Sequence, residues 1–109
     1  MDRLQALLAF YKDDPEDAFT RFAIASEYLK RGNKTEALAF FEELAASSPA
    51  YIGTYYHLGK LYEDLARLED AVRIYEIGIR RATEARDLHA RAELQDALLQ
   101  AQGIGFDED

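Results

Sequence analysis

A spacing of 34 residues recurs along this chain and constrains its fold more strongly than any other feature of the sequence. The dipeptide Asp14-Pro15 is followed 34 residues later by Ser48-Pro49. The same spacing relates apolar or small residues in five further pairs, namely Ile24 with Leu58, Ala25 with Gly59, Tyr28 with Tyr62, Ala37 with Ala71, and Phe41 with Tyr75. A period of about 20 to 50 residues is typical of proteins in which one structural unit repeats and stacks on its neighbours. The sequence therefore predicts a repeat protein.

Each period contains two segments in which apolar residues recur at intervals of three and four, and this pattern favours α-helices. The predicted helices span residues 2–12, 15–31, 34–47, 50–65, 68–84 and 87–102. Asp14 is expected to cap the second of these helices with Pro15 at its first position, and Ser48-Pro49 is expected to do the same for the fourth. Gly32 is expected to end the second helix in a left-handed turn. Because Ala66 replaces that glycine in the next period, we expect the second turn to differ.

The repeated positions alternate between small and large side chains. The small ones are expected to let helices approach closely, and the large ones to fill the space between helix pairs. The small residues are Ala25, Ala37, Gly59 and Ala71, and the large ones are Tyr28, Phe41, Tyr62 and Tyr75. A single helix pair cannot bury both of its faces, so stability is expected to come from stacking on neighbours.

This set of residues resembles the tetratricopeptide repeat family, whose pattern places aromatic, small and proline residues at fixed offsets. Residues 52–85 match at Tyr55, Leu58, Gly59, Tyr62, Ala71, Tyr75 and Gly78. Residues 18–51 match at Ile24, Ala25, Tyr28, Ala37, Phe41 and Pro49. Two positions depart from the pattern, since Arg21 replaces an aromatic residue and Leu44 a small one, and these departures put the local packing in doubt.

The resemblance implies an all-α fold, a right-handed α-solenoid of antiparallel helix pairs with about six helices. It implies a single domain over residues 1–102, made of a half repeat at 2–15, full repeats at 18–51 and 52–85, and a polar capping helix at 87–102. The acidic segment 103–109 is expected to be disordered.

Charge and composition limit the partners. The net charge is −8, and such acidity disfavours binding to the phosphate backbone of a nucleic acid. The longest apolar runs are too short to span a membrane, and the first residues lack the pattern of a secretory leader. With no cysteine in the chain, disulfides and thiolate metal sites are excluded. We expect a cytoplasmic protein with no nucleic-acid or membrane partner.

The residues that usually carry catalysis or bind metals are few. The chain has two histidines, His57 and His89, which do not have the HExxH spacing of a zinc site. His89 is expected to pack between helices, and His57 to lie at the edge of the binding groove. The sequence has no glycine-rich phosphate loop, since Gly103-Ile104-Gly105 is not expected to precede a helix. We therefore expect no cofactor, no metal and no enzymatic activity.

The resemblance implies that function comes from a concave face lined by the first helix of each pair. By the matching offsets, the partner-binding residues on this face are Phe19, Phe22, Ser26, Leu29, Tyr56, His57, Lys60 and Arg91. One branch of the family grips peptide carboxylates with a Lys, Asn, Asn, Lys, Arg clamp. At the matching positions this chain agrees only at Arg91, so a protein or peptide segment of apolar or mixed character is the favoured partner.

Two alternatives stay open at this point. Phe19 either lies in the groove or is covered by the N-terminal helix, whose leucines could pack over it. The chain is expected to be a protein interaction module, and the alternative function is a structural module that forms homo-oligomers, such as a homodimer, through its terminal helices.

Overall fold

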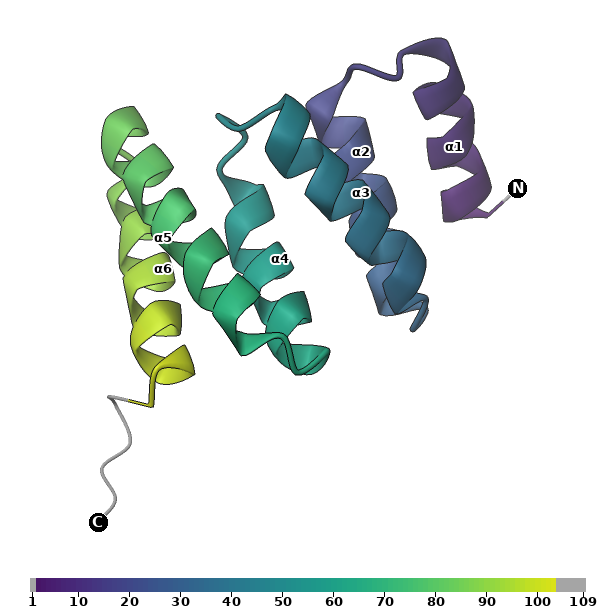
Figure 1. Cartoon of the computed structure of the whole chain (residues 1–109). Helices are drawn as coiled ribbons and strands as arrows, with labels where there is room; N and C mark the ends of the chain where they lie inside the picture. The colour runs from purple at the N-terminus through teal and green to yellow at the C-terminus, as the bar shows by residue number, and fades with distance from the viewer. Residues whose placement is uncertain (1, 104–109) are drawn as a thin grey trace. The chain divides into compact units, whose positions relative to one another are not determined.

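The computed structural model describes residues 2–103, all of whose regular structure is α-helical (Figure 1). The chain divides into two compact units, Met1–Tyr51 and Ile52–Asp109, and each is described by itself. The first contains α1 (Arg3–Asp13), α2 (Ala18–Lys30) and α3 (Lys34–Ser47); the second contains α4 (Gly53–Asp64), α5 (Leu68–Ala85) and α6 (Leu88–Ala101). The predicted all-α helical repeat fold is confirmed. Residues 104–109, which belong to the segment expected to be disordered, lie outside the described residues. The expected single domain over residues 1–102 stays a prediction.

In the first unit, α2 and α3 form a helical hairpin and α1 packs on α2. Leu7 of α1 forms a buried cluster with Ala23 and Ile24 of α2. Partly buried side chains surround this cluster, namely Leu4, Leu8, Tyr11, Tyr28 and Phe40. The apolar stripe of α1 is therefore used to cover α2.

In the second unit, α4 and α5 form the corresponding hairpin, and α6 packs on α5 and contacts α4. Gly59 of α4 lies directly against the ring of Tyr75, because a Cβ atom added at Gly59 would stand 2.1 Å from Cε1 of that ring. Tyr75, Tyr55 and Leu58 are fully buried. Here the expected alternation of small and large residues is confirmed, since only a glycine leaves room for the tyrosine.

Two helices begin later than predicted. The carboxylate of Asp17, not that of Asp14, caps α2 by accepting a hydrogen bond of 3.0 Å from the Thr20 N–H. The residue before a proline is disfavoured in the helical region, and Asp14 and Pro15 instead belong to a turn closed by a bond from the Asp17 N–H to the Asp14 carbonyl. Similarly, α4 begins at Gly53, after a turn in which the Tyr51 N–H donates to the Ser48 carbonyl.

The turns within the two hairpins have the same geometry, so the expected difference between them is wrong. Gly32 has a φ of 81° and Ala66 a φ of 61°, both in the left-handed region. In each turn the next residue donates its N–H to a helix carbonyl, from Asn33 to Tyr28 at 2.9 Å and from Arg67 to Tyr62 at 2.8 Å. Ala66 thus adopts a left-handed conformation that an alanine disfavours.

Candidate functional site

The first half of the predicted binding surface lies on α2. Phe19, Phe22, Ser26 and Leu29 follow one another at helical intervals that place them along one stripe. Phe19 is 63% exposed, whereas Phe22, Ser26 and Leu29 are partly buried. The N-terminal helix therefore does not cover Phe19, because α1 directs its leucines at the middle of α2 instead.

Phe22 takes part in the packing of the first unit as well as lining this stripe. Its ring meets the ring of buried Phe41 edge-on, with centroids 6.0 Å apart. The Phe22 ring also contacts the ring of Tyr51, with centroids 5.5 Å apart. Phe22 thus joins the stripe on α2 to the aromatic core, and its loss would disturb folding as well as any contact with a partner.

Arg21 is a buried residue near the α2 stripe. In the sequence it stood out only because it replaces an aromatic residue of the repeat pattern. The side chain is buried, with the residue 2% exposed. Its guanidinium donates to Ser47 Oγ at 2.5 Å, to Ser48 Oγ at 2.9 Å and to the Glu16 carbonyl at 3.1 Å. Arg21 therefore ties the start of α2 to the end of α3, in the place where the pattern has an aromatic ring. The polar residues that could have indicated this role in the sequence are Ser47 and Ser48, 26 and 27 residues further on, and Glu43, whose carboxylate lies 3.6 Å from the guanidinium.

The second half of the predicted surface begins on α4, where Tyr56, His57 and Lys60 lie within about one turn of the helix. The Tyr56 and His57 rings meet edge-on, with centroids 5.7 Å apart. Lys60 Nζ lies over the Tyr56 ring, 5.6 Å from its centroid, in cation–π geometry. All three side chains are partly buried, so this part of the surface is ordered by contacts among its own members.

His57 also faces α6 of the same unit. Burial lowers the pKa of His57, and the negative charge of Glu93 on α6 opposes this effect without cancelling it. Arg91, the last predicted site residue, lies on α6 and is partly buried. Within residues 2–103 its side chain forms no ion pair. The second unit thus places Tyr56, Lys60 and Arg91 on two helices that contact each other.

His89 was expected to pack between helices, and this prediction is wrong. Its side chain is 86% exposed, and its Nε2 atom lies 3.2 Å from Oε2 of Glu93 one turn further along α6. The reason is that in the described part of the chain no second helix covers this side of α6, where Ala92 and Asp96 are exposed too.

A buried tyrosine joins α5 to the last turn of α4. The Tyr75 hydroxyl donates a hydrogen bond of 2.5 Å to Oε2 of Glu63. Burial raises the pKa of Tyr75, and the neighbouring Glu63 carboxylate raises it further. This bond holds the Glu63 carboxylate at the end of α4 in a fixed position.

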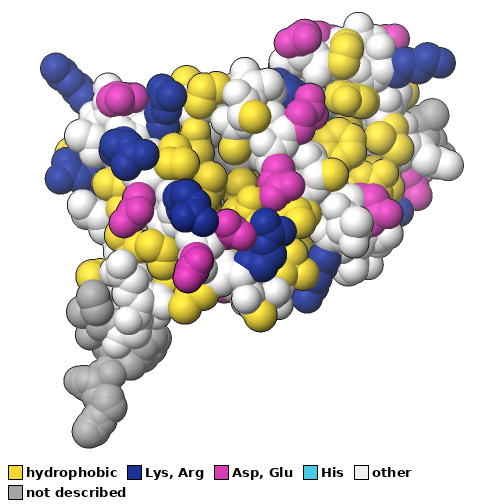
Figure 2. Space-filling view, in the orientation of Figure 1, with side chains coloured by type: hydrophobic (Ala, Val, Ile, Leu, Met, Phe, Trp, Pro, Cys, Tyr) yellow, Lys and Arg dark blue, Asp and Glu magenta, His cyan; other side chains and the backbone are white. Residues whose placement is uncertain are grey.

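Figure 2 shows acidic and basic side chains interspersed with apolar ones over the visible face. Among residues 2–103, no three histidine or acidic side chains come together in a way that could hold a metal ion. None of the described helices is long and apolar enough to cross a membrane.

The comparisons with known proteins agree with the repeat geometry. A family model described as tetratricopeptide repeat matches residues 20–51 and 52–83. A tetratricopeptide repeat domain protein from Salinibacter ruber is similar in its crystal structure, with 53% identity, coverage of 81% of this chain and 99% of that one, and a TM-score of 0.78. A solution NMR structure of such a domain protein from Salinibacter ruber gives 52% identity, coverage of 88% and 97%, and a TM-score of 0.79.

The crystal structure of MamA is similar in fold alone. It has 20% identity to this chain, with coverage of 93% of this chain and 66% of that one and a TM-score of 0.65. Among curated proteins, none matches this chain.

Proposed function

Because the chain belongs to the tetratricopeptide repeat family, we propose that it is a non-catalytic module that binds a protein or peptide segment through the first helices of its repeats. Tetratricopeptide repeats are generally protein interaction modules and are generally not enzymes. The proposed binding residues are those predicted from the offsets, with Phe19 on α2 and Tyr56 and Lys60 on α4 as the principal contacts.

The observation that carries the proposal is the exposure of Phe19. A phenylalanine that leaves most of its surface in water on the first helix of a repeat gains free energy when a partner covers it. Burying such a ring contributes about 1.5–3 kcal/mol. Leu29 lies on the same helix, and the second unit carries the Tyr56–Lys60 pair on α4. Each of these two sets of side chains suits a segment of apolar or mixed character.

The proposal also covers the class of partner and the location of the protein in the cell. The net charge of −8 supports a protein partner rather than a nucleic acid. The composition, acidic and without cysteine, supports a cytoplasmic location.

The proposal is tested with peptides selected from a random displayed library against the wild-type protein, whose affinities are then measured by calorimetry. Phe19→Ala is expected to weaken the selected peptides by about tenfold to one hundredfold, because the buried ring is lost. Tyr56→Ala is expected to weaken them as well. Phe19 is a better test than Phe22, whose contacts with Phe41 and Tyr51 would confuse binding with folding.

Phe10→Ala is the matched control, because Phe10 is an equally exposed phenylalanine, at 62%, on a helix outside the predicted surface. It is expected to leave the affinities unchanged. Selected peptides that bind the Phe19→Ala and Tyr56→Ala proteins as tightly as the wild type would contradict the proposed surface.

Self-association through the terminal helices is the second candidate function. It is supported by large exposed apolar side chains on both of them, Phe10 on α1 and Leu88 and Leu99 on α6. Sedimentation equilibrium would show a concentration-dependent dimer that Phe10→Ala or Leu88→Ala weakens. A monomer at high protein concentration would exclude it.

A further inference from the structure

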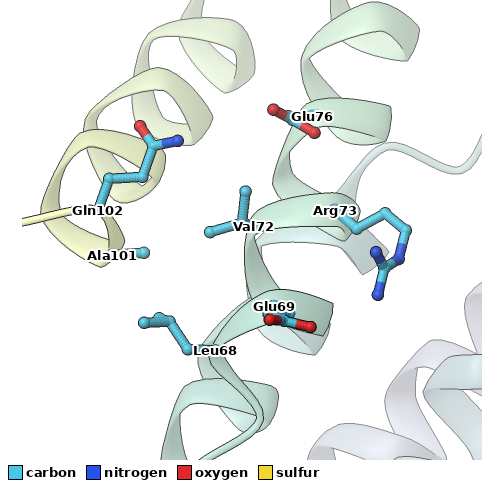
Figure 3. Close-up of a pocket in the computed structure, with 7 residues that line it drawn as sticks. All are labelled: Leu68, Glu69, Val72, Arg73, Glu76, Ala101 and Gln102. Carbon is cyan, nitrogen blue, oxygen red and sulfur yellow. The ribbon is translucent and has the colours of Figure 1, made fainter.

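A hollow lies in the second unit, where the beginning of α5 meets the end of α6. It has a volume of about 460 Å³. Figure 3 shows the Leu68 and Val72 side chains pointing from α5 toward Ala101 of α6, so that these three residues form an apolar floor. Leu68 is 49% exposed although it is a large aliphatic residue. We call this hollow the α5–α6 pocket.

The rim of the α5–α6 pocket is acidic. Glu69 and Glu76, one on each side of Val72, are exposed, and within residues 2–103 neither carboxylate has an ion-pair partner. The cation that lines the pocket with them is Arg73, whose side chain points away from α6 (Figure 3) and is held by Asp70 at 3.1 Å. The carboxylates of both glutamates are therefore available to pair with cations of an occupant.

We propose that the α5–α6 pocket binds a partner segment that inserts an aliphatic or aromatic side chain flanked by lysine or arginine. The apolar floor takes the inserted side chain, and the glutamates at the rim pair with the flanking cations. The pocket shares no residue with the predicted binding set, so the proposal does not depend on the function proposed above.

Charge decides between this occupant and two others. A second copy of the chain would bring a further net charge of −8 to an acidic rim. The chain's own residues 104–109 include Asp107, Glu108 and Asp109 and no basic residue, so they do not complement the rim either. A basic and apolar segment of another protein is the occupant that satisfies both the floor and the rim.

The test uses two capped synthetic pentapeptides, one alternating Lys with Leu and Phe, and the other carrying Glu in place of each Lys. The NMR methyl signals of Leu68 and Val72 report on the pocket. The lysine peptide is expected to shift these signals in a saturable way and the glutamate peptide to bind at least about tenfold more weakly. The double variant Glu69→Gln, Glu76→Gln is expected to weaken the lysine peptide by about threefold to tenfold.

A matched control separates the local rim from the overall charge. Asp13→Asn, Asp14→Asn changes the net charge by the same amount at exposed carboxylates of the first unit, and is expected to change the affinity by less than about twofold. Equal affinities of the two peptides, or equal effects of the two double variants, would overturn the proposal.

Two further results would assign the pocket to another occupant and overturn the proposal too. One is a shift of the Leu68 and Val72 signals when residues 104–109 are deleted, before any peptide is added. The other is a dimer in sedimentation that the lysine peptide dissociates. Failure of Phe19→Ala to affect library-selected peptides bears only on the surface proposed in the previous section.

Discussion

Arg21 shows how one residue can depart from a repeat pattern without breaking the fold. The pattern has an aromatic ring at this position, and the arginine replaces the apolar contact of a ring with hydrogen bonds to Ser47, Ser48 and the Glu16 carbonyl. Its Nε atom is buried and has no hydrogen-bond partner, so the replacement leaves one polar group unsatisfied. A buried charged network of this kind is not necessarily more stable than an apolar side chain of the same volume.

We therefore predict that Arg21→Ala and Arg21→Met differ strongly in their effect on the free energy of unfolding. Arg21→Ala is expected to lower it by about 2–4 kcal/mol, because it removes hydrogen bonds and leaves a cavity. Arg21→Met keeps most of the volume and is expected to change it by less than about 1 kcal/mol. Urea denaturation measures both, and equal losses in the two variants would show that the hydrogen bonds, not the packing, stabilise this site.

His57 makes the stability depend on pH. Burial lowers its pKa below the ordinary value, so the folded state prefers the neutral ring and the unfolded state binds the proton first as the pH falls. The contribution of His57 to stability is thus complete above its unfolded pKa of about 6.5 and is lost as the pH falls below that value. We expect the free energy of unfolding to decrease between about pH 7.5 and 5.5.

His57→Gln is expected to flatten this decrease, because glutamine does not titrate. His89→Gln is the matched control at an exposed histidine of the same unit and is expected to retain it. Denaturation at a series of pH values measures both slopes. A wild-type slope that survives in His57→Gln would mean that another group is responsible.

At the scale of the helices, the turn between α4 and α5 holds backbone strain at Ala66. Ala66 and Gly32 occupy equivalent turns with the same left-handed backbone, although an alanine there loses about 1–2 kcal/mol to the clash of its Cβ atom. The sequence difference between the hairpins therefore changes the energy of the turn and not its geometry.

Ala66→Gly is predicted to raise the free energy of unfolding by about 0.5–1 kcal/mol, since relief of the strain exceeds the added entropy of the unfolded chain. Gly32→Ala is predicted to lower it by a similar amount. Ala92→Gly, in the exposed middle of α6, is the control and is expected to lower it by about 1 kcal/mol. Thermal melting distinguishes these outcomes, and a loss of stability in Ala66→Gly would contradict the strain at this turn.

At the scale of the whole molecule, the chain carries two proposed surfaces of different character. The first helices of the repeats present aromatic and aliphatic side chains with Lys60 and Arg91 among them. The α5–α6 pocket has an apolar floor and an acidic rim. The two would select different segments, so a module of this size has room for more than one contact with a partner.

The sequence by itself determined the 34-residue repeat, the helix pairs and the small and large residues of the core, such as Gly59 and Tyr75. These are predictable because the period and the apolar stripe of a helix depend on residues close together along the chain. Even so, α2 and α4 begin later than predicted, since the turns after Asp14 and Ser48 compete with the helix for the same backbone groups.

Only the tertiary structure decided that Arg21 is buried, that Phe19 and His89 are exposed and that α5 and α6 form an open pocket. The physical reason is that burial is set by what packs against a residue from other helices. One helical pattern can place the same side chain in a core, beside a groove or in water, depending on which neighbour covers it.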